Sequence, residues 1–270
     1  MSYIDKEDYM EPVCVLCDNK EPKRIPVARI FEKFDGYLFK KEYAEAKKLL
    51  AYWVDEAKMS GDVMGELAVL NECVGLYRNL GEKENAFRFG DECLKLIEAN
   101  GLKDSLTVAT TYLNLGTMNK AFGKTQEAID CYDKAETVYE NTLKENDVRF
   151  AGLYNNKAVA LLGVKEYDRA ETLFYKAIDV LKKANGSLLE IGVTYTNLAD
   201  LQEQKNGKKD NAKITEYMQK AKDCFNDESL KRDGEYAFYA EKCIDTFRYY
   251  GMTDFAEELE RRARSFYERA

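Results

Sequence analysis

Three asparagines stand at matching places in successive stretches of this sequence, and their side chains suit recognition rather than catalysis. They are Asn114, Asn156 and Asn197, which follow one another at steps of 42 and 41 residues. A carboxamide both donates and accepts hydrogen bonds, so each one can pair with a single peptide group of an extended chain. The spacing therefore predicts a series of hydrogen bonds to the backbone of a bound peptide, with little dependence on the peptide's sequence.

Small and polar residues surround these asparagines at helical spacing. Thr110 and Thr117 lie one turn to either side of Asn114, so the expected face leaves room for a guest. Arg78, Lys120 and Arg248 share one register near the ends of their expected helices. They are either contacts for an acidic side chain or a C-terminal carboxylate, or ordinary solvated charges. The predicted peptide-binding residues are Asn114, Asn156, Asn197, Thr110, Thr117, Arg78 and Lys120.

The residue types that most enzymes need are missing from the sequence. It contains no histidine, which excludes Ser-His-Asp triads, histidine general bases and most catalytic metal sites. No glycine-rich phosphate loop and no nucleophile motif occurs. Acidic residues are abundant, but nothing in the pattern places two of them across a cleft. We therefore expect no enzyme activity, no catalytic residues and no cofactor.

The seven cysteines fall into two groups. Five lie on expected helices where a small apolar residue would serve, and we interpret them as core thiols. Cys14 and Cys17 form a CxxC pair in the segment before the helices. This pair has three interpretations: half of a zinc site shared by two chains, a redox motif, or part of an inert extension docked on the first repeat. We predict no bound metal, because a structural zinc site needs four ligands.

The elements that must position the asparagines are helices. All three prolines, Pro12, Pro22 and Pro26, lie at the start of the chain. The long proline-free remainder is rich in alanine, leucine, glutamate and lysine, as is typical of an all-helical chain. It is also repetitive, with a key alanine at steps of 40, 42, 42, 42 and 44 residues: Ala46, Ala86, Ala128, Ala170, Ala212 and Ala256.

Each repeat is expected to be two antiparallel helices. Glycines mark the turn inside a pair, and capping residues mark the helix ends. The sequence therefore predicts about six helical hairpins over residues 26–270, preceded by an N-terminal extension over residues 1–25. The predicted turn glycines are Gly81, Gly123, Gly207 and Gly251, and the predicted helix starts are Ser105, Asp147 and a capping box over Ser187–Glu190.

The repeat resembles the tetratricopeptide repeat family. Leu115-Gly116 followed by Ala128, Tyr132 and Ala135 matches its motif, and the resemblance covers roughly residues 26–270. The period near 42, with the phrase Tyr154-Asn-Asn-Lys-Ala, is closer to the long-helix repeats of kinesin light chain. The resemblance implies an all-α, right-handed superhelical solenoid. It also implies that Asn114, Asn156 and Asn197 grip a peptide backbone along the concave surface.

These observations predict a non-catalytic scaffold that holds an extended protein or peptide segment in a groove. The alternative is a signalling regulator whose superhelix changes shape when a peptide binds. The net charge of -8 and the isoelectric point near 5.0 argue against a nucleic-acid partner. The sequence has no bilayer-spanning apolar run and no N-terminal signal segment, so we expect no membrane partner and a cytoplasmic location. The oligomeric state stays open, and stacking of terminal repeats is one possibility.

Overall fold

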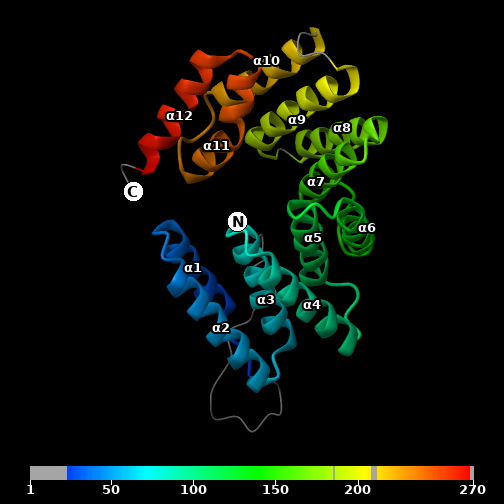
Figure 1. Ribbon diagram of the computed structural model, residues 1–270, viewed down its shortest axis with the longest axis vertical. Coiled ribbons are helices and arrows are strands. Elements are labelled where there is room, and N and C mark those ends of the chain that lie inside the picture. Colours follow the sequence, from blue (N-terminus) through cyan, green and yellow to red (C-terminus); the bar gives the residue numbers. More distant parts are fainter. Residues whose placement is uncertain (1–22, 185, 208–211, 268–270) are drawn as a thin grey trace. The chain divides into compact units, whose positions relative to one another are not determined.

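The structure is a computed structural model, and it describes residues 23–184, 186–207 and 212–267 (Figure 1). Within these ranges the chain forms twelve α-helices and no strand. The helices pair as six hairpins, which confirms the predicted all-α repeat fold. Cys14 and Cys17 lie outside the described residues.

The chain divides into two units, Met1–Thr142 and Leu143–Ala270. Each unit contains three hairpins. The helices of unit 1 are α1 (Val27–Phe39), α2 (Tyr43–Ser60), α3 (Val63–Asn79), α4 (Lys83–Ala99), α5 (Leu106–Ala121) and α6 (Thr125–Thr142). Those of unit 2 are α7 (Arg149–Gly163), α8 (Tyr167–Lys183), α9 (Leu188–Asn206), α10 (Ala212–Asn226), α11 (Gly234–Tyr249) and α12 (Thr253–Tyr267).

The turn inside every hairpin contains one residue in the left-handed region, where a side chain costs free energy and glycine does not. The four predicted turn glycines all have positive φ, as predicted. The two remaining hairpins place a lysine there, Lys41 with φ 58° and Lys165 with φ 63°. The repeated turn conformation therefore persists even where the sequence lacks glycine.

Capping was predicted with mixed success. Ser105 caps α5, because its Oγ accepts a hydrogen bond from the amide of Val108 at 3.2 Å. Asp147 Oδ1 accepts one from the amide of Arg149 at the start of α7. The predicted capping box at Ser187 is wrong, because the Ser187 side chain makes no capping bond. The carboxylate of Glu190 instead accepts a hydrogen bond from Tyr239 on α11.

Small residues allow the two helices of a hairpin to approach closely. A methyl group at Gly116 of α5 would lie 2.5 Å from ring carbon Cε1 of Tyr132 on α6, so only glycine fits there. The repeated alanines and aromatics of the motif are fully buried, as the Ala170, Phe174 and Ala177 set shows. The repeat motif therefore specifies the hairpin core.

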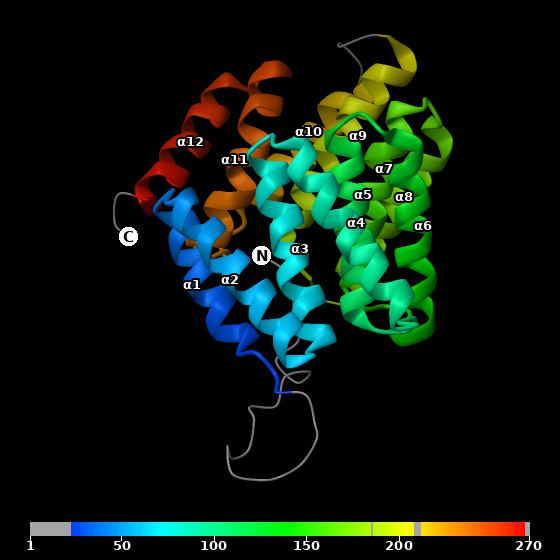
Figure 2. The ribbon, with the colours of Figure 1, turned by 60° about the horizontal axis from the view of Figure 1, so that its bottom comes forward.

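Within each unit, first helices of neighbouring hairpins pack on one another (Figure 2). In unit 1, α5 packs against α3, and in unit 2, α9 packs against both α7 and α11. This arrangement repeats one helix face from hairpin to hairpin, which is how repeat folds build binding surfaces. None of the described helices is both long and apolar enough to cross a membrane.

Candidate protein-binding face

The predicted asparagines lie on the first helices of their hairpins, on a stripe that reaches solvent. We call these residues the first-helix face of each unit. All of them are half-buried. In unit 1 the face consists of Glu72, Gly75 and Arg78 on α3 with Thr110, Asn114, Thr117 and Lys120 on α5; in unit 2 it consists of Gly152, Asn156 and Val159 on α7 with Val193, Asn197 and Asp200 on α9.

In unit 1 the carboxamide of Asn114 has no hydrogen-bond partner among the described residues. Its neighbour Asn71 on α3 is only 4% exposed and donates to Thr111 Oγ1 of α5 at 2.9 Å. The Oδ1 atom of Asn71 is buried, and within the described part of the chain nothing donates to it. The α3–α5 face therefore keeps unused hydrogen-bonding capacity.

Unit 2 repeats the same pair of positions with a different outcome. Asn155 on α7 donates to Thr194 Oγ1 of α9 at 3.1 Å, as Asn71 does to Thr111 in unit 1. Here, however, the amide of Asn197 donates to Asn155 Oδ1 at 3.0 Å. Asn197 is thus held inside its own unit, where its counterpart Asn114 is not.

Asn156 also uses its amide internally. Its Nδ2 atom donates to the backbone carbonyl of Gly152, one turn earlier on α7, at 3.0 Å. A guest that takes hydrogen bonds from Asn156 or Asn197 must therefore replace existing ones, and the net gain is smaller. The three asparagines are equivalent in register but differ in availability.

Sequence reasoning missed the Asn–Thr hydrogen bonds that join first helices. The signal is present, because Asn71 and Asn155 are 84 residues apart while Thr111 and Thr194 are 83 apart. Both threonines also donate to the carbonyl four residues earlier on their own helix, at 2.9 and 2.8 Å. Each bond therefore links two neighbouring first helices through a fixed hydroxyl.

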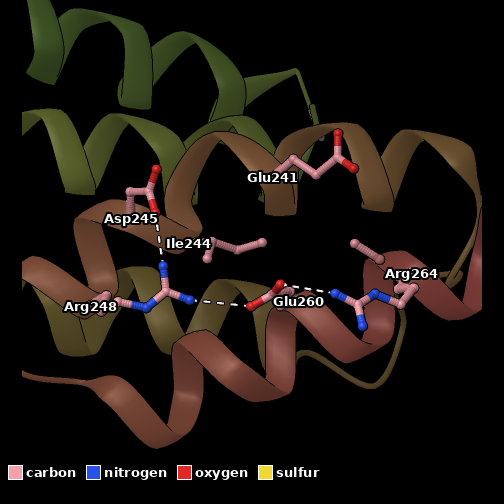
Figure 3. Close-up of a pocket in the computed structure, with 7 residues that line it drawn as sticks. Glu241, Ile244, Asp245, Arg248, Glu260 and Arg264 are labelled. Atoms are coloured by element: carbon pink, nitrogen blue, oxygen red, sulfur yellow. Dashed lines mark hydrogen bonds and ion pairs between the residues drawn. The ribbon is translucent and has the colours of Figure 1, made fainter.

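Arg78 differs from Arg248, which shares its register. The guanidinium of Arg78 donates to Asn79 Oδ1 at 2.9 and 3.2 Å, and no carboxylate among the described residues pairs with it. Burial lowers the pKa of Arg78, because desolvation penalises the charged guanidinium. Arg248 instead bridges Asp245 and Glu260 at 2.9 and 3.2 Å, between α11 and α12 (Figure 3). Arg78 is therefore a half-buried cation of the first-helix face that makes no ion pair within the described part of the chain.

Glycines leave space on the first-helix face of both units. A methyl group added at Gly75 of α3 or at Gly152 of α7 would meet no atom within 4 Å. Gly116 differs, because the ring of Tyr132 occupies the space beside its Cα atom. Tyr132 is fully buried, and its hydroxyl lies 3.3 Å from Thr117 Oγ1 of the face. Burial raises the pKa of Tyr132 to about 12, so its hydroxyl stays protonated at neutral pH.

Three of the five cysteines predicted as core thiols lie in the core, and the other two, Cys131 and Cys224, are half-buried. Cys73, Cys93 and Cys243 are buried, and burial raises the pKa of each thiol. A thiol held protonated is a poor nucleophile and a poor metal ligand. Over the described ranges, no group of three or more cysteines and carboxylates is arranged to hold a metal ion.

Comparison with known proteins identifies the repeat. Models of the tetratricopeptide repeat match residues 66–141 and 150–190, which include α3 to α6 and α7 to α8. A clustered mitochondria protein homolog from Candida albicans is 26% identical over 127 residues. That match spans 47% of this chain but only 9% of the relative.

Solved structures share the fold over most of the chain. One is a putative kinesin light chain with nearly identical TPR-like repeats from Podosopora anserina, with 14% identity and a TM-score of 0.53. The similarity covers 74% of this chain and 94% of that one. Another is BtubC (BKLC) from P. vanneervenii, with 16% identity, a TM-score of 0.54, and coverage of 90% and 91%. At this identity the likeness concerns the fold, and it agrees with the predicted kinesin light chain type of repeat.

Proposed function

The chain is a tetratricopeptide repeat protein, and from that premise we propose that it is a scaffold whose first-helix face in unit 1 holds an extended acidic segment of a partner protein. Repeats of this kind serve in general as protein-interaction scaffolds, and they expose one helix face per repeat for that purpose. No catalytic step of its own belongs to this role.

The availability of Asn114 carries the proposal. Its carboxamide has no partner among the described residues, and it holds the position from which Asn197 donates to Asn155 Oδ1 in unit 2, while the corresponding atom in unit 1, Asn71 Oδ1, is buried and unsatisfied. A buried polar atom without a partner costs about 1–3 kcal/mol, so an arrangement that supplies one is favoured. A guest peptide group at Asn114 gains a donor and an acceptor without displacing an internal bond.

Charge favours an acidic guest on this face. Arg78 is partly desolvated and makes no ion pair within the described part of the chain, although the charge of Glu72 on the same helix acts to raise its pKa, and Lys120 holds the equivalent place on α5. Glu72, one and a half turns before Arg78, leaves the other end of the face negative. A guest carboxylate would therefore lie near Arg78 and Lys120, with its backbone at Asn114 and over Gly75.

Asn156 and Asn197 would take part more weakly. Each must give up an internal hydrogen bond before it contacts a guest backbone, so the exchange is close to neutral. Of the three predicted backbone contacts, the one at Asn114 in unit 1 would therefore be the strongest, and those at Asn156 and Asn197 in unit 2 would be weaker.

A pull-down with matched variants tests the proposal. The wild-type chain and the double variant Arg78→Ala/Asn114→Ala are compared as bait in lysate from the source cells, with Lys95→Ala/Glu140→Ala as control on exposed second-helix positions. We expect the partner to bind the wild type and the control, and to bind the double variant at least about tenfold more weakly. Equal recovery by all three baits would contradict the proposed face.

A further inference from the structure

The α11–α12 hairpin has an open pocket on a face whose equivalent on α9 is covered by α11. A cavity of about 400 Å³ lies between α11 and α12, and its apolar lining residues are Ile244 and Ala263. Figure 3 shows Ile244 between the charged side chains of the two helices. Its rim is charged: Arg248 bridges Asp245 and Glu260, and Arg264 contacts Glu260 at 3.1 Å. Glu241 completes the lining.

The equivalent face of α9 shows what covers such a surface. The two helices align at an offset of 45 residues, which brings the buried Ile191, Leu198 and Gln202 of α9 onto the buried Tyr236, Cys243 and Phe247 of α11. At this offset Asp200 corresponds to Asp245, on the rim of the pocket. Asp200 accepts a hydrogen bond from Tyr250, in the turn between α11 and α12, at 2.9 Å.

Five side-chain contacts between described residues join α11 and its turn to α9, and in two of them Tyr249 and Tyr250 donate to Glu203 at 2.7 and 3.0 Å. In the other three, Tyr239 donates to Glu190 at 2.6 Å, the Sγ atom of Cys243 lies 3.8 Å from Thr196 Oγ1, and Tyr250 donates to Asp200. The α9 residues that α11 and its turn contact in these three are Glu190, Thr196 and Asp200. The equivalent positions of α11, 45 residues later, hold Glu235, Glu241 and Asp245. Glu203 corresponds in the same way to Arg248, so the receiving surface on α11 is exposed and is acidic except at Arg248.

The first hairpin carries the complementary side of the same interface. Its turn matches that of the last hairpin at an offset of 210 residues. Lys41 has φ 58° where Gly251 has 82°, and the amide of Glu42 donates to Tyr37 at 2.8 Å as that of Met252 does to Phe247 at 2.9 Å. The residues that cover α9 are Tyr239, Cys243 and Tyr250. The equivalent positions of the first hairpin, 210 residues earlier, hold Arg29, Lys33 and Lys40. All three are basic and exposed.

We propose that the exposed face of α11–α12 binds the α1–α2 hairpin of a second copy of this chain, end to end, through the pairs Arg29–Glu235, Lys33–Glu241 and Lys40–Asp245. Each pair joins opposite charges, although none of the three template contacts on α9 does. Phe39, which is 53% exposed, takes the place of Tyr249 and lies toward the pocket and Arg248.

The nearest acidic residue on α1 does not oppose this docking. Glu32 corresponds to Lys242 on α11, whose ammonium lies over the rings of Phe238 at 3.9 Å and Tyr239 at 5.1 Å on its own helix. Among the described residues at the aligned contact positions, Lys40 approaches Arg248 with like charge, and Arg248 is bridged to Asp245 and Glu260. Because the two surfaces differ, the contact is heterologous and yields an open chain of copies or a ring.

Charge reversal at either end tests the interface in the full chain. Sedimentation velocity of the wild type should show an average mass that rises with concentration and falls in high salt. The acidic-end variant Glu235→Lys/Glu241→Lys/Asp245→Lys and the basic-end variant Arg29→Glu/Lys33→Glu/Lys40→Glu should each associate at least about tenfold more weakly. An equimolar mixture of the two variants should associate again, because the reversed ends now complement each other.

The control variant Lys95→Glu/Lys144→Glu/Lys231→Glu changes the net charge as the basic-end variant does, at exposed positions outside the interface. It should associate like the wild type. A wild type that stays monomeric at every concentration would overturn the proposal. So would a mixture of folded variants that fails to associate, or a control that weakens association as much as the basic-end variant.

Discussion

At the scale of single residues, position in the repeat decides the residue type but not its hydrogen bonds. Asn114 and Asn197 occupy equivalent places, and only Asn197 donates to a neighbouring asparagine. The difference depends on side-chain rotation and on helix spacing, which a sequence pattern does not encode. The sequence could therefore predict which residues line the face, but not which of them are available to a guest.

Asp200 is the residue whose protonation is most closely tied to a contact between hairpins. Burial raises its pKa above the usual value, while the hydrogen bond from Tyr250 acts in the opposite direction. For an acid with a raised pKa in the folded state, the stabilising contribution is complete at low pH and is lost as the pH rises through that pKa.

Asp200→Asn should therefore gain stability relative to the wild type as the pH rises from 3 to 7, because asparagine has no charge to bury. Chemical unfolding of both proteins at several pH values gives the difference in unfolding free energy. Asp200→Ala is the control that also removes the acceptor for Tyr250, so it should be less stable than Asp200→Asn throughout. A difference between Asp200→Asn and the wild type that is constant with pH would contradict this account.

At the scale of helices, the sequence predicts most of the structure. The repeated alanines, the turn glycines and the Ser105 cap were confirmed because they depend on local backbone geometry and close packing. The capping box at Ser187 failed because Glu190 has a stronger alternative in Tyr239, which comes from another hairpin. Local signals therefore hold until a distant residue competes for the same side chain.

Two glycines on neighbouring first helices should respond to alanine in opposite directions. Gly116→Ala should destabilise the protein by about 1–3 kcal/mol, because its methyl group would lie 2.5 Å from the buried Tyr132 ring. Gly75→Ala faces open space and should stabilise α3 by up to about 1 kcal/mol through helix propensity. Urea unfolding of the two variants measures both effects. The same sign for both would contradict the packing described for the hairpin.

At the scale of the whole molecule, the repeat produces two kinds of surface. First-helix faces in the two units expose small and polar residues, and the terminal hairpins carry opposite charges at equivalent positions. The first kind suits a guest chain and the second suits another copy. Both follow from the repeat architecture, in which each hairpin exposes equivalent faces and packs on its neighbours through equivalent surfaces.

Site-specific photo-crosslinking measures most directly where the partner lies. A photoreactive phenylalanine analogue is placed at Gly75 on α3, where there is open space, and in separate proteins at the exposed Leu94 on α4 and Glu140 on α6. The account predicts that the partner isolated with the wild type crosslinks from position 75 and not from positions 94 or 140. Crosslinks that form from the second helices, with none from position 75, would contradict it.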